Sequence, residues 1–100
     1  MRKASTKTPS HDGRIGQYKV GDTVVMRCIP YHYIGKVIAL GEHGLTLAAG
    51  AVWLADSARW FDFLKTGKVN ETEPFVDEVF VGYGVIAEIT KWRHAIPGQT

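Results

Sequence analysis

Two strand patterns centred on glycine dominate this sequence, one at residues 33–40 and the other at residues 78–90. In each pattern apolar residues alternate around a glycine, Gly35 in the first and Gly82 with Gly84 in the second. Alternation of this kind predicts a strand with one buried face, and an internal glycine marks a strong bend at which the strand needs no side chain. Because strongly bent strands allow a sheet to close from few strands, we predict a mainly β protein built on a small closed barrel.

The predicted barrel has five strands and a short helix. The strands are expected at residues 23–29, 31–40, 45–54, 79–81 and 85–90. In the first strand Val24, Met26 and Cys28 alternate with the residues of the other face and are expected in the core. A turn at residues 41–44 joins the second strand to the third, which is interrupted at residues 48–50.

The single helix is predicted between the third and fourth strands. Asp56 or Ser57 is suited to cap its start, and Gly67 is placed to end it in a left-handed conformation. The expected apolar stripe consists of Ala58, Trp60, Phe61 and Leu64. A helix this short needs support from the barrel, so we expect it to dock there. Residues 69–77 are predicted to be an acidic connector.

Charge divides the chain into a basic arm and a nearly neutral body. The arm, residues 1–14, carries Arg2, Lys3, Lys7 and Arg14 against one acidic residue, Asp12. The whole chain has a net charge of +2, so the body is slightly negative. We therefore predict an extended N-terminal arm at 1–14, one small β-barrel domain at 15–96 and a tail at 97–100.

No cluster of residues predicts a reaction, and we expect neither enzymatic activity nor a cofactor. Cys28 and His32 have a spacing that occurs in metal sites, but a single cysteine gives too few ligands for structural zinc, and no metal is predicted. The Gly82-Tyr83-Gly84 segment lacks the lysine and helix of a phosphate loop. No apolar run approaches the ~20 residues of a membrane span, and no secretory signal or membrane partner is expected.

An alternative ligand site is suggested by aromatic side chains close to cations. Ring faces beside positive charges are what single-stranded nucleic acid or a nucleotide requires. The residues of this alternative site are Tyr31, Tyr33, Lys36, Tyr83 and Arg93. The competing interpretation is that Tyr33 and Trp92 simply pack the barrel.

The two strand patterns also resemble a known fold family. Aromatic-Ile-Gly-x-Val-x-x-Leu at residues 33–40 and Val-Phe-Val-Gly-x-Gly-x-Ile-x-x-Ile at residues 79–89 resemble Sm and Sm-like proteins, whose two signature segments would map to residues 33–47 and 78–90. The bent sheets of this family are shared by other SH3-like barrels. The segments 53–56, 64–67 and 92–94 resemble small uncharacterised proteins of tailed bacteriophages.

This resemblance implies assembly with other copies rather than the RNA contacts of the Sm family. Its fourth and fifth strands would present an edge to a neighbouring copy, here Val79, Phe80 and Val81. RNA-binding members hold a base with an Asp, an Asn and an Arg, and this chain has no counterpart of the three. Gly41 stands near the position of the Asp, Gly44 or Leu45 near that of the Asn, and Gly82 or Tyr83 near that of the Arg.

Three functions follow as predictions. The first is a phage accessory protein that acts by assembly as a virion-associated structural protein, decorating the capsid or the connector, with its basic arm on a partner. The alternative is an Sm-like ring that binds RNA, DNA or a small nucleotide and sequesters a host signal. The third is a regulator that docks on a host protein through Trp60 and Phe63. All three place the protein in the host cytoplasm, with incorporation into the virion in the first. The expected partners are further copies of the chain, in a homo-oligomer, or a phage structural protein, and in the third function a host protein.

Overall fold

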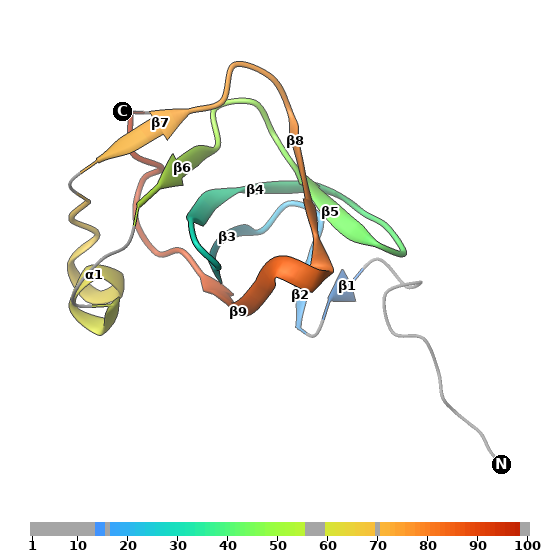
Figure 1. The fold of residues 1–100 in the computed structure, drawn as a ribbon, viewed down its shortest axis with the longest axis horizontal. Coiled ribbons are helices and arrows are strands. Elements are labelled where there is room, and N and C mark those ends of the chain that lie inside the picture. The colour runs from blue at the N-terminus through green and yellow to red at the C-terminus, as the bar shows by residue number, and fades with distance from the viewer. Residues whose placement is uncertain (1–13, 16, 56–59, 70, 99–100) are drawn as a thin grey trace, which may run out of the picture.

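The computed structural model describes residues 14–15, 17–55, 60–69 and 71–98, so that Arg2, Lys3, Lys7 and the two capping candidates Asp56 and Ser57 lie outside the described residues. The elements in chain order are β1 Arg14–Ile15, β2 Tyr18–Lys19, β3 Thr23–Cys28, β4 His32–Leu40, β5 Gly44–Leu47, β6 Val52–Leu54, α1 Trp60–Thr66, β7 Thr72–Pro74, β8 Val79–Gly82, the 3-10 helix η3 Tyr83–Val85, and β9 Ile86–Lys91. Figure 1 shows strands β3 to β9 as a strongly curved sheet with α1 beside it, while β1 and β2 form a separate hairpin.

Seven of the strands form an antiparallel sheet in the order β7-β6-β4-β3-β9, and β5 links β4 to β8. The bent strand β4 makes this possible, because its first half pairs with β6 and its second half with β5. The predicted mainly β fold is confirmed, but the sheet is not closed into a barrel. Closure requires the edge strands to pair. In the described part of the chain β8 pairs with β5 alone and β9 with β3 alone, and η3 separates β8 from β9.

The core consists of two clusters, one on each face of β3. Val24, Met26 and Cys28 belong to the first cluster, as their alternation predicts, and Val25 belongs to the second. The helix α1 covers the second cluster, where Phe63 is buried against Trp92 with ring centroids 5.2 Å apart. The alternating pattern of β3 therefore supplies apolar side chains to both layers.

The two glycine-centred patterns have different physical causes. Gly35 is buried, and a Cβ atom at this position would lie 2.7 Å from the Cβ of Ala51, so a side chain has no room there. At Gly82 the nearest atom would be 3.8 Å away, and at Gly84 nothing lies within 4 Å. Side chains would therefore fit at Gly82 and Gly84, unlike at Gly35. The chain leaves its strand there because it enters η3.

The predicted helix exists, but its buried face differs from the predicted one. Phe61, expected in the apolar stripe, is 81% exposed, whereas Phe63 is 3% exposed. The helix contacts the core through Trp60, Phe63 and Leu64, which follow the i, i+3, i+4 spacing of one helix face. Gly67 ends the helix as predicted, with a φ of 74°, and its N–H donates to the carbonyl of Phe63 at 2.8 Å.

The acidic connector is the clearest omission of the sequence prediction. Residues 72–74 form β7, which pairs with β6 so that Trp53 lies opposite Glu73 and Val52 opposite Pro74. A proline is tolerated there because β7 is an edge strand and needs hydrogen bonds on one side only. The neighbouring Phe75 N–H donates to the carbonyl of Ala51 at 2.8 Å and fixes the end of the strand. In the described part of the chain no helix is both long and apolar enough to cross a membrane.

Candidate functional site

Four aromatic side chains gather on one face of β4, β6 and β7. These residues, which we call the aromatic platform, are Tyr31, Tyr33, Trp53 and Phe75. Tyr33, Trp53 and Glu73 are opposed to one another on three adjacent strands, so their side chains project from the same face. Tyr31 and Phe75 lie two residues from Tyr33 and Glu73, and a two-residue period brings them to that face as well.

The rings of the aromatic platform form two pairs. The Tyr31 and Trp53 centroids are 4.4 Å apart with the rings tilted by 46°, and the Tyr33 and Phe75 centroids are 6.0 Å apart with an angle of 20°. Tyr31 is 44% exposed, and the other three rings are half-buried. Solvent therefore reaches several aromatic surfaces at once. Such surfaces attract apolar groups and, through the ring quadrupole, cations.

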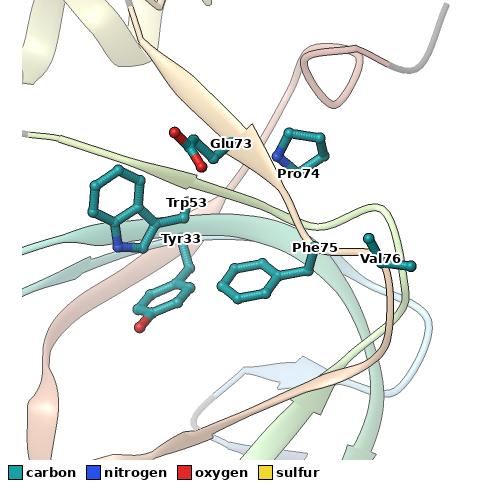
Figure 2. A pocket seen from close by; sticks show the side chains of 6 residues that line it. All are labelled: Tyr33, Trp53, Glu73, Pro74, Phe75 and Val76. Carbon is teal, nitrogen blue, oxygen red and sulfur yellow. The ribbon is translucent and has the colours of Figure 1, made fainter.

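A pocket of about 540 Å³ opens beside these rings. Its lining, shown in Figure 2, is Tyr33, Trp53, Glu73, Pro74, Phe75 and Val76. Figure 2 shows the Glu73 carboxylate beside the Trp53 indole, while Phe75 lies next to Tyr33. Val76 is 90% exposed at the end of the pocket. The pocket thus combines ring faces, two aliphatic walls and one carboxylate, a set that suits a positively charged organic group with an apolar stem.

The segment 71–78, which supplies four of the lining residues of this pocket and which we call its acidic border, is strongly acidic. Residues 71–78 contain four acidic side chains and no basic one. The four acidic residues, all exposed, are Glu71, Glu73, Asp77 and Glu78. A negative border repels the phosphates of nucleic acid and attracts cations.

The residues of the alternative nucleic-acid site are not brought together. Tyr31 and Tyr33 belong to the aromatic platform, but Lys36 is three residues from Tyr33 on the same strand and therefore projects from its opposite face. The Tyr83 hydroxyl donates to the carbonyl of Gly41 at 2.8 Å, and burial raises the pKa of Tyr83. Tyr83 thus holds the turn between β4 and β5.

Arg93, the fifth of these residues, lines a separate, more polar pocket of about 360 Å³. We call it the basic pocket, and its lining is Gln17, Tyr18, Lys19, Asp22, Thr90, Lys91 and Arg93. The Asp22 carboxylate accepts from the Lys19 N–H at 3.1 Å and pairs with the Lys19 ammonium at 3.4 Å. The Lys19 N–H contributes most to lowering the pKa of Asp22, with the charges of Lys19 and Lys91 adding to it.

No protein-family model, curated protein or solved structure matches this chain. The aromatic platform and the basic pocket are therefore interpreted from their own chemistry. The two share no lining residue, so they would take different ligands or different parts of one large ligand.

Cys28 and His32 contact each other, but through the main chain of the cysteine. The Cys28 N–H donates to Nδ1 of His32 at 3.2 Å, and both residues are 3% exposed. Burial raises the pKa of the Cys28 thiol to about 11, so it stays protonated at neutral pH. The predicted core position of Cys28 is confirmed. Among the described residues no three His, Cys, Asp or Glu side chains come together to hold a metal.

The predicted oligomer edge lies on β8. One side of this strand pairs with β5, and in the described part of the chain no strand pairs with the other side. Val81 is buried, Val79 is half-buried and Phe80 is 61% exposed. The association of copies through this edge stays a prediction. Of the predicted arm residues, Arg14 pairs its backbone with Lys19 in the hairpin of β1 and β2.

The sequence prediction missed three residues of the candidate site, Trp53, Glu73 and Phe75. Trp53 has a detectable signal, because it alternates with buried Val52 and Leu54 and must therefore face the other way. Glu73 and Phe75 have no such signal, since their position depends on β7, a three-residue strand that contains a proline.

Proposed function

We propose that this protein is a non-enzymatic binding module that acts by assembly, holding an extended, positively charged segment of a partner protein on the aromatic platform. The observation that carries the proposal is the row Tyr33, Trp53 and Glu73, which places two ring faces and a carboxylate side by side above an open pocket. Rings in a partly dry pocket provide most of the binding energy of many protein interfaces. The carboxylate selects a cation among the groups that could cover them.

The setting of this proposal is a bacteriophage particle or its assembly in the host cytoplasm. The resemblance to small phage proteins supports this setting, and the bent β4, which pairs with β6 and β5 in turn, supports an Sm-like or SH3-like relationship of the sheet. The partner would then be a capsid or connector protein, or another copy of this chain. An accessory protein of this kind needs a binding surface and no catalytic centre.

A second candidate function is the binding of RNA, DNA or a nucleotide, and one observation favours it. The basic pocket brings Lys19, Lys91 and Arg93 together, and only one carboxylate, already paired with Lys19, opposes them. Such a pocket suits a phosphate group. It shares no lining residue with the pocket beside Tyr33, so stacking of a base on Tyr33 does not follow from phosphate binding near Arg93.

The test of the main proposal is to pan a random peptide library on the full-length protein. The expected result is enrichment of peptides rich in Lys or Arg, which Trp53→Ala no longer retains. Phe61→Ala is the matched control, because Phe61 is an exposed ring on the helix α1, away from the aromatic platform, and this variant should retain the same peptides. An absence of enrichment, or equal retention by Trp53→Ala, would overturn the proposal.

The second candidate is tested with labelled single-stranded DNA and with inorganic phosphate. Binding that Arg93→Ala abolishes and Trp53→Ala leaves unchanged would assign the basic pocket to a phosphate ligand. No binding of either probe by the wild-type protein would eliminate this candidate.

A further inference from the structure

We infer that the segment bound on the aromatic platform is the basic arm, residues 1–14, of a second copy of this chain. The inference rests on the proposed function and names its partner.

The charges of the arm and of the acidic border are complementary. The arm carries four basic residues against one acidic residue, and residues 71–78 carry four acidic residues and no basic one. Every acidic side chain of that border is exposed and can be reached by a partner. Complementary charge of this kind orients two surfaces before contact and excludes wrong partners.

The side chains of the arm also match the pocket in shape. An Arg guanidinium is flat, stacks on aromatic faces and donates to a carboxylate in a fork. A Lys side chain lays an apolar stem along rings and keeps its charge at the end. The adjacent Trp53 ring and Glu73 carboxylate offer both contacts to one cation, and Arg2, Lys3 and Lys7 supply three candidates for it.

The position of the arm favours a second copy over the same molecule. The arm joins the described chain at β1, and Figure 1 shows β1 and β7 at opposite ends of the molecule. A neighbour whose β7 lies beside the β1 end would present its aromatic platform close to the point where the arm begins. The two contact surfaces then differ, and repetition of such a contact produces a ring or a filament.

Two charge-reversed full-length variants test this inference by complementation. The platform variant is Glu73→Lys, and the arm variant combines Arg2→Glu, Lys3→Glu and Lys7→Glu. Alone, each should remain monomeric under conditions in which the wild-type protein associates. Their equimolar mixture should form dimers and nothing larger, because each dimer contains a single intact arm-to-platform contact. Sedimentation velocity and native mass spectrometry measure this directly.

The matched control is Glu42→Lys, which reverses an exposed carboxylate in the turn between β4 and β5 and should leave association unchanged. Circular dichroism of every variant verifies that each is folded. Association of the wild-type protein should also weaken as salt increases, because exposed charges are screened.

The inference is overturned if the wild-type protein is monomeric, if the mixture fails to dimerise, or if either variant associates alone. Association that only Phe80→Lys abolishes would assign the contact to the β8 edge instead. A monomeric protein that still enriches basic peptides in panning would leave the proposed function standing and eliminate the second copy as partner. A monomeric protein that enriches no peptides would eliminate both.

Discussion

Tyr33 on β4 and Trp53 on β6 are direct cross-strand partners, and the next pair along the same two strands is Ile34 with Val52. Ile34 and Val52 are buried in the cluster beneath α1, whereas Tyr33 and Trp53 project from the other face and are half-buried. The same short ladder therefore stabilises the fold with one face and exposes aromatic surface with the other.

The exposed ring of the aromatic platform allows binding to be separated from stability. Tyr31 lies outside β4, is 44% exposed, and contacts Trp53. Tyr31→Ala should therefore change the free energy of unfolding by less than about 1 kcal/mol. The same variant should reduce retention of the enriched peptides, because it removes one of the ring faces. Urea unfolding and peptide binding, measured on one preparation, check both parts. A large loss of stability would show that Tyr31 is part of the core.

Two alanine substitutions test whether the two glycine patterns differ in the room that they leave for a side chain. Gly35→Ala places a Cβ 2.7 Å from that of Ala51, and neither atom can move without the backbone, so we expect a loss of about 1–3 kcal/mol in stability. Gly84→Ala meets nothing within 4 Å, and the expected change is within about 0.5 kcal/mol. Urea denaturation measures both. Equal losses would contradict the packing described around Gly35.

The buried face of α1 is tested by two phenylalanines of the same helix. Phe63→Ala removes a ring that is 3% exposed and should lower stability by about 3–5 kcal/mol. Phe61→Ala removes a ring that is 81% exposed and should change it by no more than about 0.5 kcal/mol. Thermal unfolding followed by circular dichroism distinguishes the two. The third function predicted from the sequence, docking through Phe63, is thus wrong in its residue, since a partner can reach Phe61 and not Phe63.

Comparison of the sequence predictions with the structure shows which parts of the fold can be predicted from local patterns. The alternation in β3 correctly predicted the core face with Val24, Met26 and Cys28. It did not predict that Val25, on the opposite face, is buried as well. The helix and two residues of its buried face, Trp60 and Leu64, were predicted correctly, but Phe61 was expected in place of Phe63. Ala58, the other predicted member of the stripe, lies outside the described residues. Half of the aromatic platform was named from the sequence, as Tyr31 and Tyr33.

The other half depends on long-range pairing that no local pattern records. The predicted connector at residues 69–77 contains three acidic residues and a proline and has a low strand propensity. Its residues Thr72–Pro74 form β7 because Val52 to Leu54 offer an open edge with which to pair. The predicted barrel closure was wrong because local sequence did not decide the conformation at Gly82 and Gly84. These glycines permit either a bent strand, as predicted, or the 3-10 helix that the chain adopts.

The buried thiol should be unreactive in the folded protein. Burial raises the pKa of Cys28 from 9.0 to about 11, and the thiolate is the reactive form. At pH 8 the thiolate fraction in the native state is then roughly one hundredfold lower than in the unfolded state, so labelling by a disulfide reagent should be slower by about that factor or more. Labelling in buffer and in urea provides the comparison. Similar rates would show that Cys28 is accessible.

The interactions that lower the pKa of Asp22 should stabilise the folded protein at neutral pH and be lost in acid. Its pKa is lowered below 3.8 in the folded protein by the Lys19 N–H and by the charges of Lys19 and Lys91. A lowered carboxyl pKa contributes stability above the unfolded value, and this contribution is lost as pH falls through the folded value. Asp22→Asn should therefore be less stable than the wild type at pH 7, and the difference should shrink below about pH 4. Thermal unfolding across this range measures it. A constant difference would contradict the assigned interaction.

The most direct test of the central claim is titration of a synthetic peptide of residues 1–14 into the full-length arm variant, whose own reversed arm cannot compete. Isothermal titration calorimetry should show saturable binding of one peptide per chain. Adding Trp53→Ala to the same variant should weaken this binding by about tenfold or more, because it removes the ring on which the cation stacks. Absence of binding, or equal affinity with and without Trp53, would contradict the account.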